Sequence, residues 1–188
     1  MDNSQQLNVV DDYRWSHLMT MKNNKSELEK VTLEHQAAKL FMTLYEAQYA
    51  IPMRHIWHNQ PAKPDVSCYR NGHKLDLEIA HLYGSETEAM AVLGRSLSLE
   101  MEQAIAQMAE SDSAIRLKNA LGRLLNNKAN KRYDSQQVWL VIRNASSCWT
   151  QDDLQSALSD IPIAEQHPFK EIWLIADFYG NNGLIKIF

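Results

Sequence analysis

Two carboxylates, Asp65 and Glu78, flank a stretch of the chain with Asn71-Gly72 at its centre. An Asn-Gly pair between alternating polar and apolar residues predicts a β-hairpin, because both central residues of a type I′ turn need a positive φ. A two-residue turn here pairs Arg70 with His73. Counting outward from that pair places Asp65 opposite Glu78 on one face, with their Cβ atoms about 4.5–5.5 Å apart.

The predicted hairpin has one acidic face and one apolar face. The acidic face carries Asp65, Ser67, Lys74, Asp76 and Glu78, and the apolar face carries Val66, Cys68, Leu75, Leu77 and Ile79. Opposed like charges destabilise a sheet, so three acids on one face need a compensating cation. A hard divalent ion with oxygen ligands, such as Mg²⁺, suits that need. The alternative is a solvated polar face with Lys74 as a partial counter-charge.

Length and composition predict one ordinary globular domain. The chain has 188 residues, of which 45% are hydrophobic and 22% charged. No apolar run approaches the roughly 20 residues of a membrane span, and the polar start is not a secretory signal. Cys68 and Cys148 lack the spacing of a metal site. We therefore expect a cytoplasmic protein with reduced thiols and no membrane partner.

Basic residues are segregated in one part of a chain whose formal net charge is −4. Six occur between positions 116 and 133 without an acid: Arg116, Lys118, Arg123, Lys128, Lys131 and Arg132. Such a stripe can follow a phosphate backbone. The alternative is a solvated helix face, although such faces usually mix both signs.

Periodicity predicts a mixed α/β domain over residues 26–188, preceded by an N-terminal arm over residues 1–25. The first expected elements are a helix from a capping box at Ser26 to Pro52, a strand near 53–57 and the hairpin. A long helix follows a second capping box at Ser85, and a basic helix begins at about 111–113. Buried strands are expected at 138–142 and 172–176, with a helix after Thr150 between them, and a last strand at 184–188. The apolar stripes of the first and third helices include Leu28 and Ile115.

This order of elements, with Pro64-Asp65 on one hairpin strand and Glu78-Ile79-Ala80 on the next, resembles the PD-(D/E)XK nuclease superfamily. The resemblance implies a restriction-endonuclease-like fold, with a mixed central sheet flanked by helices. It also implies Mg²⁺-dependent hydrolysis of DNA, with Mn²⁺ as a possible substitute. Asp65, Glu78 and the Ile79 carbonyl would hold the metal. Glu34 is our choice for the acid of the preceding helix, with Glu29 as the second candidate.

The sequence departs from the family pattern at Ala80, where the family usually has a catalytic lysine. Some members supply a lysine from the following helix, so we assign this role to Lys128, with Lys131 as the alternative. The other five basic residues of the stripe, Arg116, Lys118, Arg123, Lys131 and Arg132, are interpreted as contacts to nucleic acid.

Two further hypotheses stay open, and Ala80 supports the first of them. A catalytically inactive domain of the same fold would bind nucleic acid or a protein partner. A structural or regulatory α/β domain would carry the acids incidentally. A nuclease that cuts both strands would commonly act as a homodimer. His55 and His58 have no third metal ligand nearby in the sequence, so we interpret them as surface or loop residues.

Overall fold

The computed structural model describes residues 7–60, 64–85, 90 and 112–188, with side chains described from residue 26 onward. The chain divides into two compact units, residues 1–33 and residues 34–188. The first unit is helical from Leu7, and the second contains the whole sheet. The long helix expected after Ser85 falls on residues outside the described ranges.

The first helix, α1, spans Leu7–Tyr49. The prediction that it begins at Ser26 was wrong, since no glycine or proline occurs before Pro52 to interrupt the helix. It ends as predicted just before Pro52, with Ala50 at a φ of 54°. Leu28 is 66% exposed, so its assignment to the apolar stripe was also wrong.

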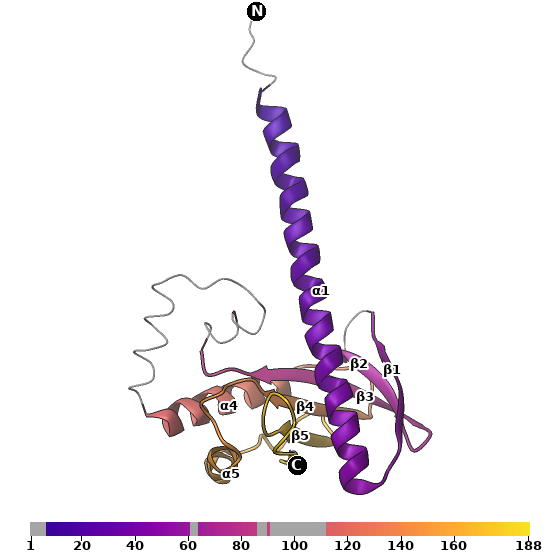
Figure 1. The fold of residues 1–188 in the computed structure, drawn as a ribbon, viewed down its shortest axis with the longest axis vertical. Helices are drawn as coiled ribbons and strands as arrows, with labels where there is room; N and C mark the ends of the chain where they lie inside the picture. Colours follow the sequence, from indigo (N-terminus) through magenta and orange to yellow (C-terminus); the bar gives the residue numbers. More distant parts are fainter. Residues whose placement is uncertain (1–6, 61–63, 86–89, 91–111) are drawn as a thin grey trace, which may run out of the picture. The chain divides into compact units, whose positions relative to one another are not determined.

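Six strands form one mixed sheet in which each strand neighbours the next along the chain (Figure 1). They are β1 (Met53–His58), β2 (Val66–Arg70), β3 (His73–Leu82), β4 (Val138–Asn144), β5 (Glu171–Ile175) and β6 (Leu184–Lys186). The pairs β3–β4 and β4–β5 are parallel, and the other three pairs are antiparallel. The prediction of an α/β fold with a mixed central sheet is confirmed.

The hairpin register is confirmed. Arg70 pairs with His73 across a turn in which Asn71 and Gly72 have φ values of 47° and 80°. The pairing continues to Val66 opposite Leu77. The β2 and β3 side chains whose faces the sequence predicted therefore lie on those faces.

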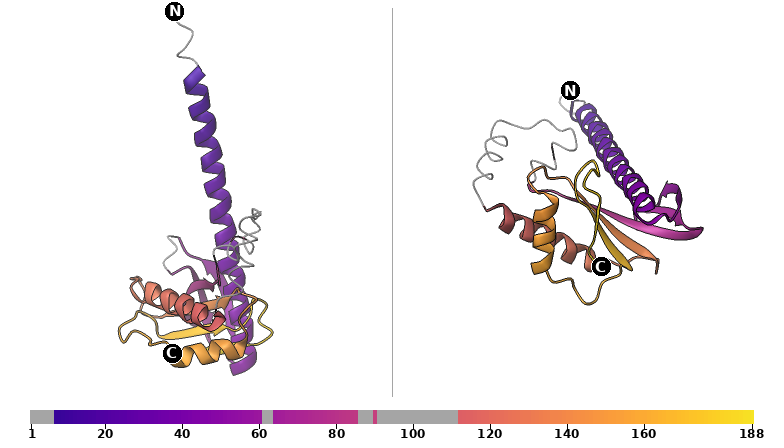
Figure 2. Two further views of the ribbon diagram at one scale, coloured as in Figure 1. Left: turned by 90° about the vertical axis from the view of Figure 1, so that its left-hand side faces the viewer. Right: turned by 60° about the horizontal axis from the view of Figure 1, so that its bottom comes forward.

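Helices cover both faces of the sheet (Figure 2). The α1-side core gathers residues from the C-terminal part of α1 and from the apolar faces of β2 and β3. The α4-side core packs α4 (Ser113–Ala129) and α5 (Gln151–Asp160) against β4 and β5. The buried side chains of α4 are Leu117, Leu121 and Leu125. Ile115 is 57% exposed, because the stripe is set by these leucines one turn apart; the inward assignment of Ile115 was wrong.

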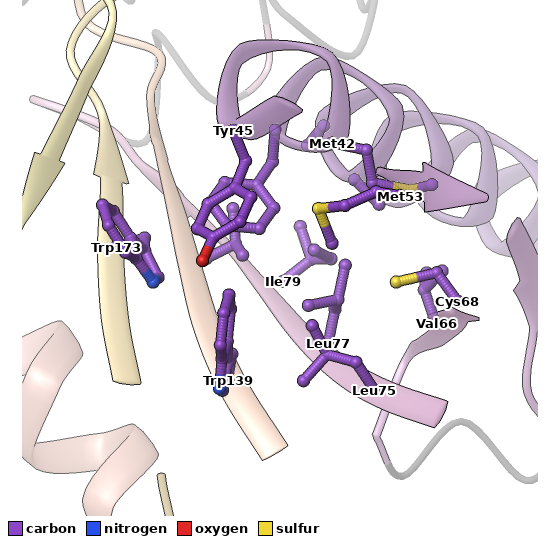
Figure 3. Packing of buried hydrophobic residues seen from close by; sticks show 14 of the residues in the cluster. Met42, Tyr45, Met53, Val66, Cys68, Leu75, Leu77, Ile79, Trp139 and Trp173 are labelled. Carbon is purple, nitrogen blue, oxygen red and sulfur yellow. The ribbon is translucent and has the colours of Figure 1, made fainter. Parts of the chain in front are cut away.

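Aromatic rings gather on the side of the α1-side core next to β4 and β5 (Figure 3). Phe41 is fully buried, and its ring centroid lies 5.6 Å from Tyr45, 6.3 Å from Trp139 and 6.0 Å from Trp173. Tilted and edge-to-face rings at such distances contribute beyond the area that they bury. Phe41 thus joins α1 to β4 and β5.

We expect Phe41→Ala to lower the free energy of unfolding by about 3–5 kcal/mol, because it leaves a cavity among three rings. Urea unfolding followed by circular dichroism measures the change. Leu28→Ala is the control on the same helix, with an expected change within about 0.5 kcal/mol. A loss below about 1 kcal/mol for Phe41→Ala would contradict this account of the core.

Candidate active site

The candidate site lies where β2 ends and β3 continues. Pairing between the two strands starts at Val66 opposite Leu77, so Asp65 and Glu78 occupy the next step of the same register. Both acids are buried, with 5% and 2% of their surface exposed. The main-chain amide of Ile79 donates a hydrogen bond of 2.8 Å to Asp65 Oδ2. The Asp65 carboxylate therefore accepts a main-chain hydrogen bond of β3 beyond the end of β2, next to Glu78.

Asn59, in the segment after β1, holds the Pro64-Asp65 corner in place. Its main-chain amide donates to the Asp65 carbonyl at 3.0 Å. Its side-chain amide donates to the Pro64 carbonyl and to Ser67 Oγ, both at 2.9 Å. Three bonds from one residue position the backbone of Asp65, so Asn59 is a positioning residue that sequence reasoning missed.

Glu34 brings a third buried carboxylate from α1, with 5% of its surface exposed. Its Oε2 lies 2.9 Å from Nε2 of His58, whose Nδ1 lies 3.0 Å from the Asn59 carbonyl. A carbonyl only accepts, so Nδ1 donates to it and Nε2 faces the Glu34 carboxylate. The interpretation of His58 as a surface or loop residue was wrong: it ends β1 and pairs with Glu34.

Two lysines, one in the last turn of α4 and one just after the helix, contact Glu78. Lys128 Nζ lies 2.6 Å from Glu78 Oε1 and donates to the Ile79 carbonyl at 3.0 Å. Lys131 Nζ lies 3.2 Å from the same Glu78 oxygen. Ala80, the next residue on the face of Glu78, is buried in the α4-side core. The structure thus brings Asp65, Glu78 and both candidate lysines together, while the catalytic roles assigned to them stay predictions.

No protein-family model, curated protein or solved structure matches this chain.

The surroundings of Asp65 disfavour its charged form. Burial, followed by the charges of Glu78 and Glu34, raises the pKa of Asp65 from its usual 3.8 to about 6. The Ile79 amide and the charge of Lys128 act in the opposite direction without cancelling these effects. An additional cation next to Asp65 would therefore stabilise its charged form.

Tyr133, just after α4, is another residue near the acids that the sequence did not single out. Its hydroxyl is buried, and burial together with the charge of Glu78 raises its pKa. Its ring packs on Phe169, with centroids 5.6 Å apart. Neither Tyr133 nor His58 carries a local sequence signal for this role, because both reach the acids through the tertiary fold.

The basic stripe separates into different environments. Lys118 Nζ lies 2.5 Å from Asp160 of α5, which neutralises it. Arg116 is half-buried. Arg123 and Arg132 are exposed and remain the best placed of the stripe to contact a partner. Among the described helices, none is long and apolar enough to cross a membrane.

The oxygen donors at the site suit a hard divalent cation. Two carboxylates, Asp65 and Glu78, adjoin the Ile79 carbonyl, and oxygen groups of this kind bind Mg²⁺. Within the described part of the chain, no three Asp, Glu, His or Cys side chains group closely enough to ligate one ion. A metal would therefore rest on two side chains and a main-chain carbonyl. The Lys128 ammonium contacts two of these three groups.

We expect Asp65→Asn to raise the melting temperature of the metal-free protein above about pH 6. A raised pKa means that the folded state disfavours the Asp65 charge, so the wild type loses stability as the pH rises from about 4 to 6. Asparagine carries no charge and avoids this loss, which amounts to at most about 3 kcal/mol. Thermal melts from pH 4 to 8 in chelator should show the advantage growing with pH and vanishing near pH 4.

Asp153→Asn is the control with the opposite sign. Hydrogen bonds from the Thr150 backbone and side chain lower the pKa of Asp153, so losing this charge should lower the melting temperature at neutral pH. An Asp65→Asn protein that is less stable than the wild type at pH 7 would contradict the account of Asp65.

Proposed function

We propose that this protein is a metal-dependent nuclease that hydrolyses phosphodiester bonds in DNA. The observation that carries the proposal is the meeting of Lys128 Nζ with both Glu78 Oε1, at 2.6 Å, and the Ile79 carbonyl, at 3.0 Å. A lysine from α4 thereby reaches Glu78 near Ala80, the position at which the PD-(D/E)XK pattern has a lysine and this chain does not. The mixed α/β sheet is compatible with a restriction-endonuclease-like fold, which we include in the proposal.

Each group has a distinct role in this proposal. Asp65, Glu78 and the Ile79 carbonyl would hold Mg²⁺, or Mn²⁺ in its place. The ion would polarise the scissile phosphate and lower the pKa of its water. Lys128 stabilises the negative charge that develops on the phosphate, and its release from Glu78 and Ile79 frees two oxygens of the site. Glu34 of α1, paired with His58, would help to position a second ion.

A second candidate function rests on the same contacts. An ammonium fixed on Glu78 and Ile79 is a permanent counter-charge that stabilises buried acids without a metal. In that case the domain retains the nuclease arrangement without its chemistry, and it binds nucleic acid or a protein partner. The two candidates differ in whether DNA is cleaved when a divalent ion is added.

We expect the purified protein to cleave plasmid or linear DNA with Mg²⁺ or Mn²⁺ and to be inactive in chelator. Asp65→Asn should abolish cleavage, because it removes one of the two carboxylate ligands. Lys170→Ala, an exposed lysine just before β5, is the matched control and should cleave like the wild type. Gel electrophoresis follows the products. DNA binding without cleavage in either ion would select the inactive domain instead.

Lys128→Ala should lower the cleavage rate by about 10²–10³, since a fixed donor that stabilises developing charge is typically worth that much. DNA affinity should change only a few-fold, because the ammonium faces Glu78 rather than the exposed surface. Single-turnover kinetics and a binding titration measure the two effects separately. An equal loss in rate and affinity would make Lys128 an ordinary phosphate contact. A melting curve confirms that the variant is folded.

A further inference from the structure

Three aromatic side chains lie on β1 and β2 outside both cores. Trp57 and Tyr69 have ring centroids 5.5 Å apart, and the His55 ring lies 6.2 Å from Tyr69. Tyr69 is 39% exposed, His55 is exposed and Trp57 is half-buried. Neither Trp57 nor Tyr69 belongs to the α1-side or the α4-side core. We call these three residues the aromatic patch.

A β-bulge places Trp57 on this face. Arg54 pairs with Tyr69 and Trp57 pairs with Ser67, so β1 uses one residue more than β2 over this step. Without the extra residue, the alternation of the strand would turn Trp57 toward α1. His55, inside the bulge, has a φ of 54°, a conformation that non-glycine residues seldom adopt. Bulges of this kind commonly re-aim side chains next to functional sites.

The aromatic patch shares its face of the sheet with the candidate site. Val66 and Cys68 point into the α1-side core (Figure 3), so Ser67 and Tyr69 point to the opposite face. Ser67, the strand partner of Trp57, donates to Asp76 Oδ1 at 2.5 Å. Tyr69 lies four residues beyond Asp65, which is about 13 Å along an extended chain.

A lysine adjoins the rings. Lys74 pairs with Tyr69 across the hairpin; its side chain is 56% exposed, and its Nζ lies 3.1 Å from Asp76 Oδ1. The acid offsets the lysine charge, so the two neighbouring aromatic rings are the elements of this surface that can stack nucleobases. A base offers its flat face to such a ring only when it is not stacked in a duplex.

We propose that Trp57 and Tyr69 stack unpaired bases of a single strand whose backbone reaches Asp65 and Glu78. This inference rests on the proposed nuclease function and names its substrate class as single-stranded DNA. The strand runs along β2, with one end at the acids and its bases on the aromatic patch. Stacking tolerates every base, so the patch supplies affinity without sequence specificity.

The test is a binding titration with a short fluorescein-labelled single-stranded oligonucleotide and its duplex form, in chelator so that neither is cut. Trp57→Ala and Tyr69→Ala should each weaken single-strand binding about 5- to 100-fold, the equivalent of about 1–3 kcal/mol per stacked base. Duplex affinity should change less than two-fold. Tyr69→Phe keeps the ring and should bind the single strand like the wild type.

Salt dependence separates stacking from charge. The alanine variants of the patch should keep the wild-type slope of log affinity against log salt, because no charge is removed. The double variant Arg123→Ala and Arg132→Ala should instead flatten that slope, if these exposed arginines contact phosphates. An oligonucleotide containing 2-aminopurine adds a direct readout, since its fluorescence should be quenched by the wild type and not by Trp57→Ala.

Several results would overturn the inference: no binding of the single strand, unchanged affinity in both alanine variants, or an equal loss on duplex and single strand. Failure of this inference is distinguishable from failure of the nuclease proposal. Metal-dependent cleavage together with patch variants that bind normally removes the stacking role alone. Ring-dependent single-strand binding by a protein that never cleaves keeps the stacking role and removes the nuclease.

Discussion

The two-residue turn at Asn71 and Gly72 determines which face of the sheet each side chain of β2 and β3 occupies. A slip of one residue would exchange the two faces of one strand. On β3 it would turn Asp76 and Glu78 into the α1-side core and remove Leu77 from it. The cost of burying unpaired carboxylates among apolar side chains excludes that arrangement. The turn geometry and the apolar pattern therefore specify the same register, and Asp65 meets Glu78 as a consequence of both.

Packing of α4 then decides which cation reaches the acids. Leu117, Leu121 and Leu125 are buried at successive turns, so the face of the helix that meets the sheet is fixed. Lys128 follows Leu125 by three residues and continues that face toward β3. Its ammonium contacts Glu78 Oε1 and the Ile79 carbonyl. Position 80 can then be a small apolar residue that packs under the helix.

Local rules in the sequence were sufficient for the hairpin, the buried strands and the end of α1 at Pro52, because a turn dipeptide, apolar runs and a helix breaker act at short range. The resemblance to the nuclease superfamily pointed to Lys128, which the structure brings to Glu78. The sequence did not reveal the partnership of His58 with Glu34 or the bonds of Asn59, since these depend on contacts between residues distant in the chain. The bulge at His55 was equally hidden. Glycine would favour its positive φ, and no glycine occurs there.

The contacts of Lys128 fit both a catalytic lysine and a permanent counter-charge. The charges around the two acids bear on which of these roles it has. Burial, with the charges of Glu78 and Glu34, raises the pKa of Asp65 to about 6, and the charge of Lys128 lowers it only in part. The Lys128 and Lys131 ammonium groups both lie on Glu78, at 2.6 and 3.2 Å, and neither is bonded to Asp65. The two lysines therefore offset the charge of Glu78 more directly than that of Asp65, and a further cation beside Asp65 would stabilise its charged form.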